Sequence, residues 1–267
     1  EEAGAKIVTR SECFKADVCL CVRMPSTDDI NNLKSNSLLI GILNPYENKS
    51  EFSNLNKNKI SSCCMELIPR ISRAQSMDVL SSQANLAGYR SVIDAAEQFG
   101  KAFPMMMTAA GRVNPAKVMI LGVGVAGLQA IATAKRLGAV VSATDVRAAT
   151  KEQVESLGGK FIMVEDDEAQ NAETAGGYAK EMSEDYKKKQ AQLIADTVSK
   201  QDIVICTALI PGKKAPVLIT EEMVSSMIPG SVVIDLAVEA GGNCPLSKMN
   251  EIITVSYTHL RAHETQQ

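Results

Sequence analysis

The sequence has no tryptophan, and aromatic residues make up only 4% of its 267 positions, against 45% hydrophobic residues overall. A core built from such a chain is mainly aliphatic. The charges exclude another class of protein. The 28 basic and 31 acidic residues give a net charge of −3, without the positive excess that nucleic-acid-binding proteins carry. A chain of this length has room for about two domains, and no nucleic-acid partner is expected.

Patterns that indicate a metal site or a disulfide framework are also missing. The seven cysteines are an odd number and include no C-x-x-C pair. They are Cys13, Cys19, Cys21, Cys63, Cys64, Cys206 and Cys244. Reduced, buried thiols in a cytosolic or organelle-matrix protein fit this pattern best. The two histidines, His259 and His263, have helical i, i+4 spacing but lie in a terminal segment without a fold pattern, so no metal site is expected.

The sequence does not begin with methionine and has no signal peptide, so we expect it to start within a longer protein. Its longest nearly apolar run, residues 118–134, contains three glycines and Gln129. A membrane-spanning helix needs about 20 consecutive, predominantly apolar residues. The run is therefore interpreted as a strand, a turn and a helix.

Within this run, the apolar segment Val118–Leu121 leads into a G-x-G-x-x-G pattern at Gly122, Gly124 and Gly127. In dinucleotide-binding proteins the first glycine makes a tight turn, and the second lets the backbone approach the pyrophosphate. The third allows close packing of the helix on the strand. The N–H groups at the start of that helix favour phosphate. The pattern alone also fits an ordinary glycine-rich turn.

A second apolar segment supports a nucleotide site. Residues 139–144 are typical of a strand and end at Asp145, about twenty residues after the glycines, where a ribose-binding carboxylate belongs. Because a carboxylate repels a 2′-phosphate, the predicted cofactor is NAD(H). Arg147 could instead serve a 2′-phosphate, but we interpret it as a solvated surface charge. Val125 and Val146 are expected to line the same site.

Alternating strands and helices predict an α/β fold of two Rossmann-like domains with parallel sheets, and a ligand at the carboxyl ends of the strands. The expected domains are residues 1–110, with a connecting helix at about 76–103 interrupted at Gly88, and residues 111–255. Expected strands are 16–22, 37–43, 62–68, 118–121, 139–145, 160–164, 202–207, 231–236 and 252–255. Expected helices are 27–34, 184–200 and 220–227; residues 44–59 indicate a loop or weak helix, and 111–115 a turn.

One polar segment, residues 165–178, fits neither a strand nor a helix and carries two glycines beside Tyr178. Loops of this length in compact domains are usually functional or disordered. Two interpretations stay open. The segment is either a lid that carries Tyr178 over the nucleotide or a surface insertion.

Several longer segments resemble the NAD(H)-binding domain of the proton-translocating NAD(P) transhydrogenases, a family related to alanine dehydrogenase. The segments are residues 65–78 (MELIPRISRAQSMD), 104–111 (PMMMTAAG), 145–159 (DVRAATKEQVESLGG), 173–178 (ETAGGY), 207–212 (TALIPG) and 238–246 (VEAGGNCPL). They are longer and more specific than the glycine pattern. Together they extend the resemblance over residues 16–254.

The resemblance implies a first domain that is incomplete here and NAD(H) bound in a cleft between the two domains. By position, the residues around the nicotinamide and its ribose are Arg70, Gln75, Asp78 and Ser81. Asp145 falls on the adenosine-ribose ligand, and Tyr178 on the tyrosine of a mobile loop. Thr207, Ala208 and Leu209 follow one expected strand and line the cleft.

The implied reaction passes hydride directly from NADH to NADP⁺, so it needs positioning and electrostatics rather than a general acid or base. Gln75 would hold a carboxamide or reach toward the partner nucleotide, and Asp78 would orient Arg70. Without the resemblance, Arg70 and Asp78 would also fit a structural ion pair, and Ser81 a serine on a helix surface.

The implied partners are an NADP(H)-binding domain, a membrane domain that moves protons, and a second copy of the chain. The implied location is a soluble domain facing the cytoplasm or the mitochondrial matrix, held at the bacterial or mitochondrial inner membrane by the rest of the enzyme. Alone, the chain is expected to bind NADH but to translocate no protons.

Two rival functions stay open. Alanine dehydrogenase shares the fold but needs a catalytic histidine, and this chain has none before His259. An NAD-binding regulatory module would keep the glycines and Asp145 without needing Arg70, Gln75 and Asp78 together. Residues 256–267 match nothing in the family and are interpreted as a foreign tail, which we exclude from the predicted fold.

Overall fold

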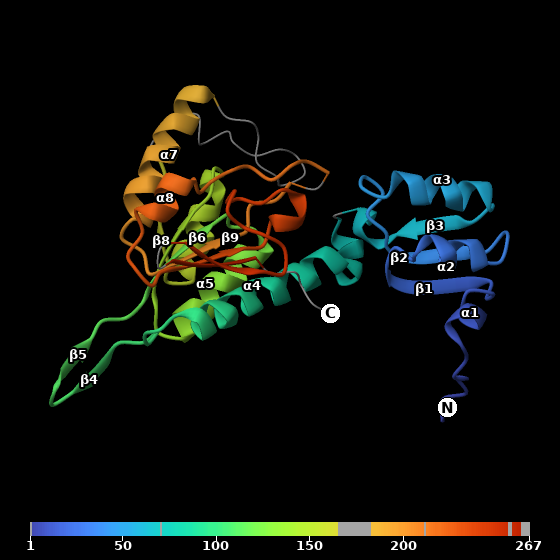
Figure 1. The fold of residues 1–267 in the computed structure, drawn as a ribbon, viewed down its shortest axis with the longest axis horizontal. Coiled ribbons are helices and arrows are strands. Elements are labelled where there is room, and N and C mark those ends of the chain that lie inside the picture. The colour runs from blue at the N-terminus through green and yellow to red at the C-terminus, as the bar shows by residue number, and fades with distance from the viewer. Residues whose placement is uncertain (1, 70, 165–182, 211, 256–257, 263–267) are drawn as a thin grey trace. The chain divides into compact units, whose positions relative to one another are not determined.

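The structure is a computed structural model that describes residues 2–69, 71–164, 183–210, 212–255 and 258–262 (Figure 1). The chain divides into two compact units, Glu1–Leu80 and Ser81–Gln267. Both contain a sheet of parallel strands that alternate with helices, so the predicted α/β class is confirmed.

The first unit holds a three-stranded parallel sheet in the order β1-β2-β3. Its elements are α1 (Arg10–Cys13), β1 (Val18–Arg23), α2 (Thr27–Asn32), β2 (Leu38–Ile42), α3 (Lys49–Lys57), β3 (Ser61–Cys64), and the 3-10 helices η1 (Met65–Leu67) and η2 (Ser72–Met77). Helix α2 begins where expected, because the Ser26 side chain accepts a hydrogen bond from the Asp29 N–H. The three predicted strands are confirmed, although the third ends at Cys64, where η1 begins.

Aliphatic side chains form the core of this unit, as the scarcity of aromatic residues predicts. Ile30, Leu39, Leu43 and Leu55 are almost fully buried and belong to one cluster. Alternate residues of β1 point the other way and are exposed apolar side chains: Val18, Leu20 and Val22.

The second unit is built on a seven-stranded sheet in the order β11-β12-β10-β9-β6-β7-β8. Its strands are β6 (Lys117–Leu121), β7 (Val140–Thr144), β8 (Lys160–Phe161), β9 (Ile203–Cys206), β10 (Val232–Asp235), β11 (Ile252–Val255) and β12 (Thr258–Ala262). Its α-helices are α4 (Val79–Gln98), α5 (Val125–Arg136), α6 (Lys151–Ser156), α7 (Glu184–Val198) and α8 (Glu221–Ser225). All described neighbours pair in parallel except β11 with β12.

The alternation of side chains along the strands divides the core of this unit into two layers. In β6, Val118 and Ile120 pack with residues of α4, α5 and α6, whereas Met119 and Leu121 pack with residues of α7 and α8. Helices therefore cover both faces of the sheet, and the strands are buried on both sides. This arrangement leaves the carboxyl ends of the strands for loops, where a ligand is expected.

The structure differs from the predicted domain boundary at residue 110. Helix α4 contributes Val92 and Ala95 to the core beside α5, so the division falls between Leu80 and Ser81. The predicted interruption of this helix at Gly88 is wrong. Gly88 is buried within α4, and a Cβ there would lie 2.0 Å from the carbonyl oxygen of Ala126, so the glycine allows α4 and α5 to touch.

Two further elements differ from the sequence prediction. Residues expected to form a turn belong to a two-stranded hairpin, β4 (Met106–Thr108) and β5 (Gly111–Val113). The backbone of β12 pairs with β10 and β11, although the predicted fold excludes residues 256–267. Backbone pairing requires no particular side-chain pattern, which explains why the sequence indicates neither element. A foreign origin of residues 256–267 stays a prediction.

Candidate functional site

The three glycines form the turn between β6 and α5. Gly122 has a φ of 96° and therefore needs a glycine. A Cβ on Gly127 would lie 2.0 Å from the carbonyl oxygen of Gly122, so this glycine allows α5 to pack against the turn. A Cβ on Gly124, the N-cap residue of α5, would meet nothing within 4 Å. The turn and packing roles of Gly122 and Gly127 are thus confirmed, and Gly124 faces open space.

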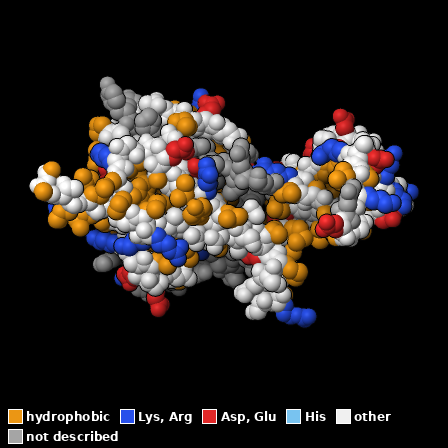
Figure 2. Space-filling view, turned by 90° about the horizontal axis from the view of Figure 1, so that it is seen from below, with side chains coloured by type: hydrophobic (Ala, Val, Ile, Leu, Met, Phe, Trp, Pro, Cys, Tyr) orange, Lys and Arg blue, Asp and Glu red, His pale blue; other side chains and the backbone are white. Residues whose placement is uncertain are grey.

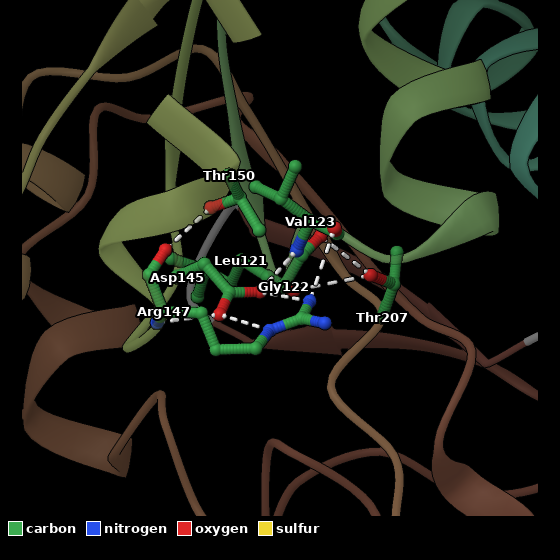
Figure 3. A network of polar contacts seen from close by, with 7 residues as sticks. All are labelled: Leu121, Gly122, Val123, Asp145, Arg147, Thr150 and Thr207. Atoms are coloured by element: carbon green, nitrogen blue, oxygen red, sulfur yellow. Dashed lines mark hydrogen bonds and ion pairs between the residues drawn. The ribbon is translucent and has the colours of Figure 1, made fainter. Parts of the chain in front are cut away.

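The Asp145 carboxylate lies beside this turn and is held by four N–H donors (Figure 3). Its Oδ2 accepts from the Val123 N–H at 2.8 Å, which ties the end of β7 to the glycine turn. The Arg147 backbone N–H and Nε donate to Oδ1, and the Arg147 Nη2 donates to Oδ2, each at 2.9 Å. An ionised carboxylate has about four lone-pair sites, so these donors engage all of them.

Arg147 is therefore not the solvated surface charge that the sequence suggested. Its side chain is only 16% exposed, it forms an ion pair with Asp145, and its Nη2 also donates to the carbonyl oxygen of Val123 at 3.1 Å. An acid two residues before an arginine can form a compact bidentate pair, which the sequence prediction did not consider. A ribose hydroxyl that binds Asp145 has to share the carboxylate with this guanidinium.

The loop after β9 packs against the same turn. The Thr207 hydroxyl donates to the carbonyl oxygen of Gly122 at 2.8 Å, and a Cβ on Gly122 would lie 2.9 Å from the Ala208 nitrogen. Leu209 is 48% exposed. The structure therefore brings Thr207 and Ala208 to the glycine turn, as expected for neighbouring parallel strands.

Sequence reasoning missed two buried polar residues behind this loop, Asp235 and Asn243. Both have no exposed surface. Asp235 ends β10 and accepts hydrogen bonds from the N–H groups of Ala237, Asn243 and Cys244. An acid at the end of an apolar strand, followed by Gly-Gly-Asn at residues 241–243, was the available signal.

Burial controls the protonation of this region. It raises the pKa of Asp235, although the backbone hydrogen bonds to its carboxylate work in the opposite direction. Burial also raises the pKa of Cys206 well above its usual value, and the nearby Asp235 carboxylate adds to the effect. The pKa of Cys244 is raised as well, mainly by burial. These thiols therefore stay protonated at neutral pH.

This predicts a clear order of thiol reactivity. In the native protein at about pH 8, iodoacetamide should alkylate the exposed Cys13 and Cys63 at least about tenfold faster than the buried Cys206 and Cys244. Peptide mass spectrometry over time measures each rate, and the urea-unfolded chain is the control in which all four should react alike. Equal rates in the native protein would contradict the burial of Cys206.

The remaining predicted site residues are spread over both units. Gln75 lies in η2, Asp78 directly after it, and Ser81 in the first turn of α4. Val125 is the first residue of α5, and Val146 separates Asp145 from Arg147. Arg70 and Tyr178 lie outside the described residues, as does the segment predicted as a lid or insertion.

The described residues contain neither a metal-binding cluster nor a membrane-spanning helix. Among them, no group of three or more histidine, cysteine, aspartate or glutamate side chains could hold a metal ion. None of the described helices is long and apolar enough to cross a membrane.

Comparison with known proteins finds matches for both units. The profile "Alanine dehydrogenase/PNT, C-terminal domain" matches residues 91–261, and the corresponding N-terminal domain matches residues 1–87. The chain is 62% identical over 258 residues to the first of the separate chains that form the NAD(P) transhydrogenase alpha subunit of Rhodospirillum rubrum, a match over 94% of this chain and 67% of that protein. The crystal structure of transhydrogenase from Sinorhizobium meliloti is similar with a TM-score of 0.89 and 53% identity, over 99% of this chain and 71% of that one.

Similarity to the rival enzyme is more distant. The chain is 28% identical over 249 residues to "Alanine dehydrogenase" of Bacillus subtilis, a match over 91% of this chain and 58% of that protein. The comparisons therefore favour the transhydrogenase interpretation over the alanine dehydrogenase one.

Proposed function

Because the chain belongs to the alanine dehydrogenase/PNT family, on the side of the transhydrogenase alpha subunits, we propose that it is the NAD(H)-binding component of an NAD(P) transhydrogenase. In this proposal it exchanges hydride between NADH and NADP⁺ held on a partner domain, and a membrane domain couples the exchange to proton translocation. The observation that carries the proposal is the glycine turn. Gly124 faces open space at the start of α5 and beside Asp145.

The residues present fit a dinucleotide. The first turn of α5 offers N–H groups to the pyrophosphate, because the first four N–H groups of a helix have no partner within it. The open space at Gly124 leaves room for phosphate to approach the backbone. Asp145 is placed to accept from the adenosine ribose, in competition with Arg147.

The nicotinamide half is assigned to the residues carried by the family resemblance. Arg70, Gln75, Asp78 and Ser81 would orient the ring and its ribose, and Tyr178 would cover the nucleotide. When bound, NADH supplies the hydride, and the chain's own residues supply binding and orientation. This accounts for a site without histidine, since direct hydride transfer between two nicotinamide rings moves no proton to or from the protein.

We also propose that the chain forms a homodimer through the β4–β5 hairpin, which projects from the sheet of the second unit (Figure 1). Met105, Met106, Met107 and Val113 are exposed there, at 55%, 52%, 70% and 49%. Figure 2 shows hydrophobic side chains toward this end of the second unit. Clustered exposed apolar side chains mark interaction sites, and a twofold dimer uses the same patch on both copies.

The hairpin can be tested by adding one charge. Met107→Glu should lower the mass in solution from about twice 28.6 kDa to 28.6 kDa at micromolar concentration, because the carboxylate would be desolvated in the interface. Light scattering after gel filtration measures the mass. Met249→Glu, at another exposed methionine of the second unit, is the matched control and should leave the dimer intact. A monomeric wild-type chain would contradict the homodimer.

The cofactor assignment is tested by equilibrium titration of the chain with NADH and NADPH, followed by nucleotide fluorescence. We expect NADH to bind at least about tenfold more tightly, because Asp145 disfavours a 2′-phosphate. Equal or tighter binding of NADPH would contradict the proposed component. Binding of L-alanine to the NADH complex would favour the alternative, an alanine dehydrogenase-like enzyme.

A further inference from the structure

Asn243 is completely buried, and both polar groups of its side chain are used. Its Oδ1 accepts from the Ala208 N–H at 3.1 Å, and its Nδ2 donates to the Ala208 carbonyl oxygen at 2.9 Å. A further bond runs from Nδ2 to the carbonyl oxygen of Pro216 at 2.7 Å. The amide therefore pairs with Ala208 through both of its backbone groups, as a neighbouring strand would.

This pairing begins where the sheet ends. The last residues of β9 and β10 to pair are Cys206 and Asp235, after which the Leu236 N–H donates to the Cys206 carbonyl oxygen. Beyond that point the two strands separate, and the Asn243 amide takes the place of the missing ladder beside Ala208.

Asp235 fixes the backbone that carries this amide. Its Oδ2 accepts from the N–H groups of Asn243 and Cys244 at 2.8 and 3.0 Å, and its Oδ1 accepts from Ala237 at 2.9 Å. Three backbone donors on one buried carboxylate hold residues 237–244 in a single conformation. The side chain of Asn243 is therefore aimed at Ala208 before any ligand arrives.

The contacts continue from Ala208 to the glycine turn. The Ala208 nitrogen would lie 2.9 Å from a Cβ on Gly122, and the Thr207 hydroxyl donates to the Gly122 carbonyl oxygen. An unbroken series of contacts thus joins Asp235, Asn243 and Ala208 to the turn between β6 and α5. Because Asn243 engages both backbone groups of Ala208, this residue affects a bound cofactor through its position.

We propose that Asn243, held by Asp235, is a positioning residue that fixes the loops after β6, β9 and β10 as one rigid binding surface for the dinucleotide. This inference rests on the proposed NAD(H) function. In the sheet order β7-β6-β9, Asp145 lies after β7 and Ala208 after β9, on opposite sides of the glycine turn. With the adenosine at Asp145, the nicotinamide half lies toward the loop that Asn243 positions.

The test compares NADH with 5′-AMP, which lacks the nicotinamide half. Asn243→Ser removes both bonds to Ala208, and we expect NADH binding to weaken by about tenfold while 5′-AMP binding changes by less than about threefold. Both affinities are measured by calorimetry, at a temperature where circular dichroism shows the variant to be folded. Loss of stability alone would not weaken the two ligands differently.

The matched control is Val198→Ala. Val198 is also fully buried in the second unit, but it ends α7 near the amino end of β9, away from Ala208. It should lower stability and leave both affinities unchanged. An Asn243→Ser variant that binds NADH like the wild type, or that loses NADH and 5′-AMP in parallel, would overturn the inference. If the wild type binds no NADH, the proposed function fails instead.

A measurement on the wild type covers the case in which Asn243→Ser does not fold. The Ala208 amide hydrogen should exchange slowly with solvent both without and with NADH, because its bond to Asn243 is formed in the free protein. Slow exchange in both states supports the inference. Exchange of the free protein's Ala208 amide as fast as that of an exposed loop would overturn it.

Discussion

Replacing Asp145 with alanine should weaken NADH binding by roughly ten- to hundredfold, the effect expected for losing a hydrogen bond to a charged acceptor. NADPH binding should strengthen at the same time. The Arg147 guanidinium lies 2.9 Å from the Asp145 carboxylate and also contacts the carbonyl oxygen of Val123, so it stays near the turn when the carboxylate is removed. It then becomes a bidentate donor for a 2′-phosphate. Parallel titrations of wild type and variant with both nucleotides measure the change.

A double variant isolates the role of Arg147. Asp145→Ala combined with Arg147→Met should bind NADH as weakly as the single variant but lose the gain in NADPH affinity. The methionine keeps an apolar stem of similar length without the charge. If NADPH affinity rises equally in both variants, the guanidinium is not responsible, and the ion pair has no role in nucleotide preference.

The glycines of the turn should separate folding from binding. Gly124→Ala should reduce NADH affinity by about tenfold or more, because the added methyl group occupies the space where the pyrophosphate approaches the backbone. The fold should survive, with less than about 1 kcal/mol lost, since Gly124 has an extended backbone and no atom within 4 Å of the added Cβ. Urea unfolding and NADH titration together measure the two effects.

Gly127→Ala should do the reverse in magnitude. Its Cβ would lie 2.0 Å from the Gly122 carbonyl oxygen, so α5 has to move, and the free energy of unfolding should fall by at least about 2 kcal/mol. Gly100→Ala, at a glycine with open space outside the site, is the control for both and should change neither quantity much. Unchanged NADH binding in Gly124→Ala would exclude this turn as the pyrophosphate site.

The parts of the fold that were predictable are those in which side-chain pattern and backbone conformation agree. The apolar segments around Val118, Val141 and Val232 are buried on both faces of the sheet, so their sequences indicated strands directly. Gly122 and Gly127 were predictable because sterics leave no other residue for a positive φ or for a 2.0 Å approach.

The features that were missed depend on contacts between distant segments. Gly88 looked like an interruption because helical propensity is local, whereas its role is to admit Ala126 of α5. Arg147 looked solvated because its partner Asp145 had already been assigned to the cofactor. Asn243 was overlooked since its partner Ala208 lies 35 residues away along the chain. Such polar pairs have no periodic pattern from which they could be recognised.

The measurement that tests the transhydrogenase function most directly is hydride transfer from NADH to an NADP⁺ analogue, with the chain mixed with a transhydrogenase NADP(H)-binding domain. We predict transfer that requires both components and falls at least about tenfold in Gln75→Ala, because orientation of the reacting rings contributes most of the catalysis. NADH binding without any transfer in the mixture would contradict the transhydrogenase function and leave a dinucleotide-binding module.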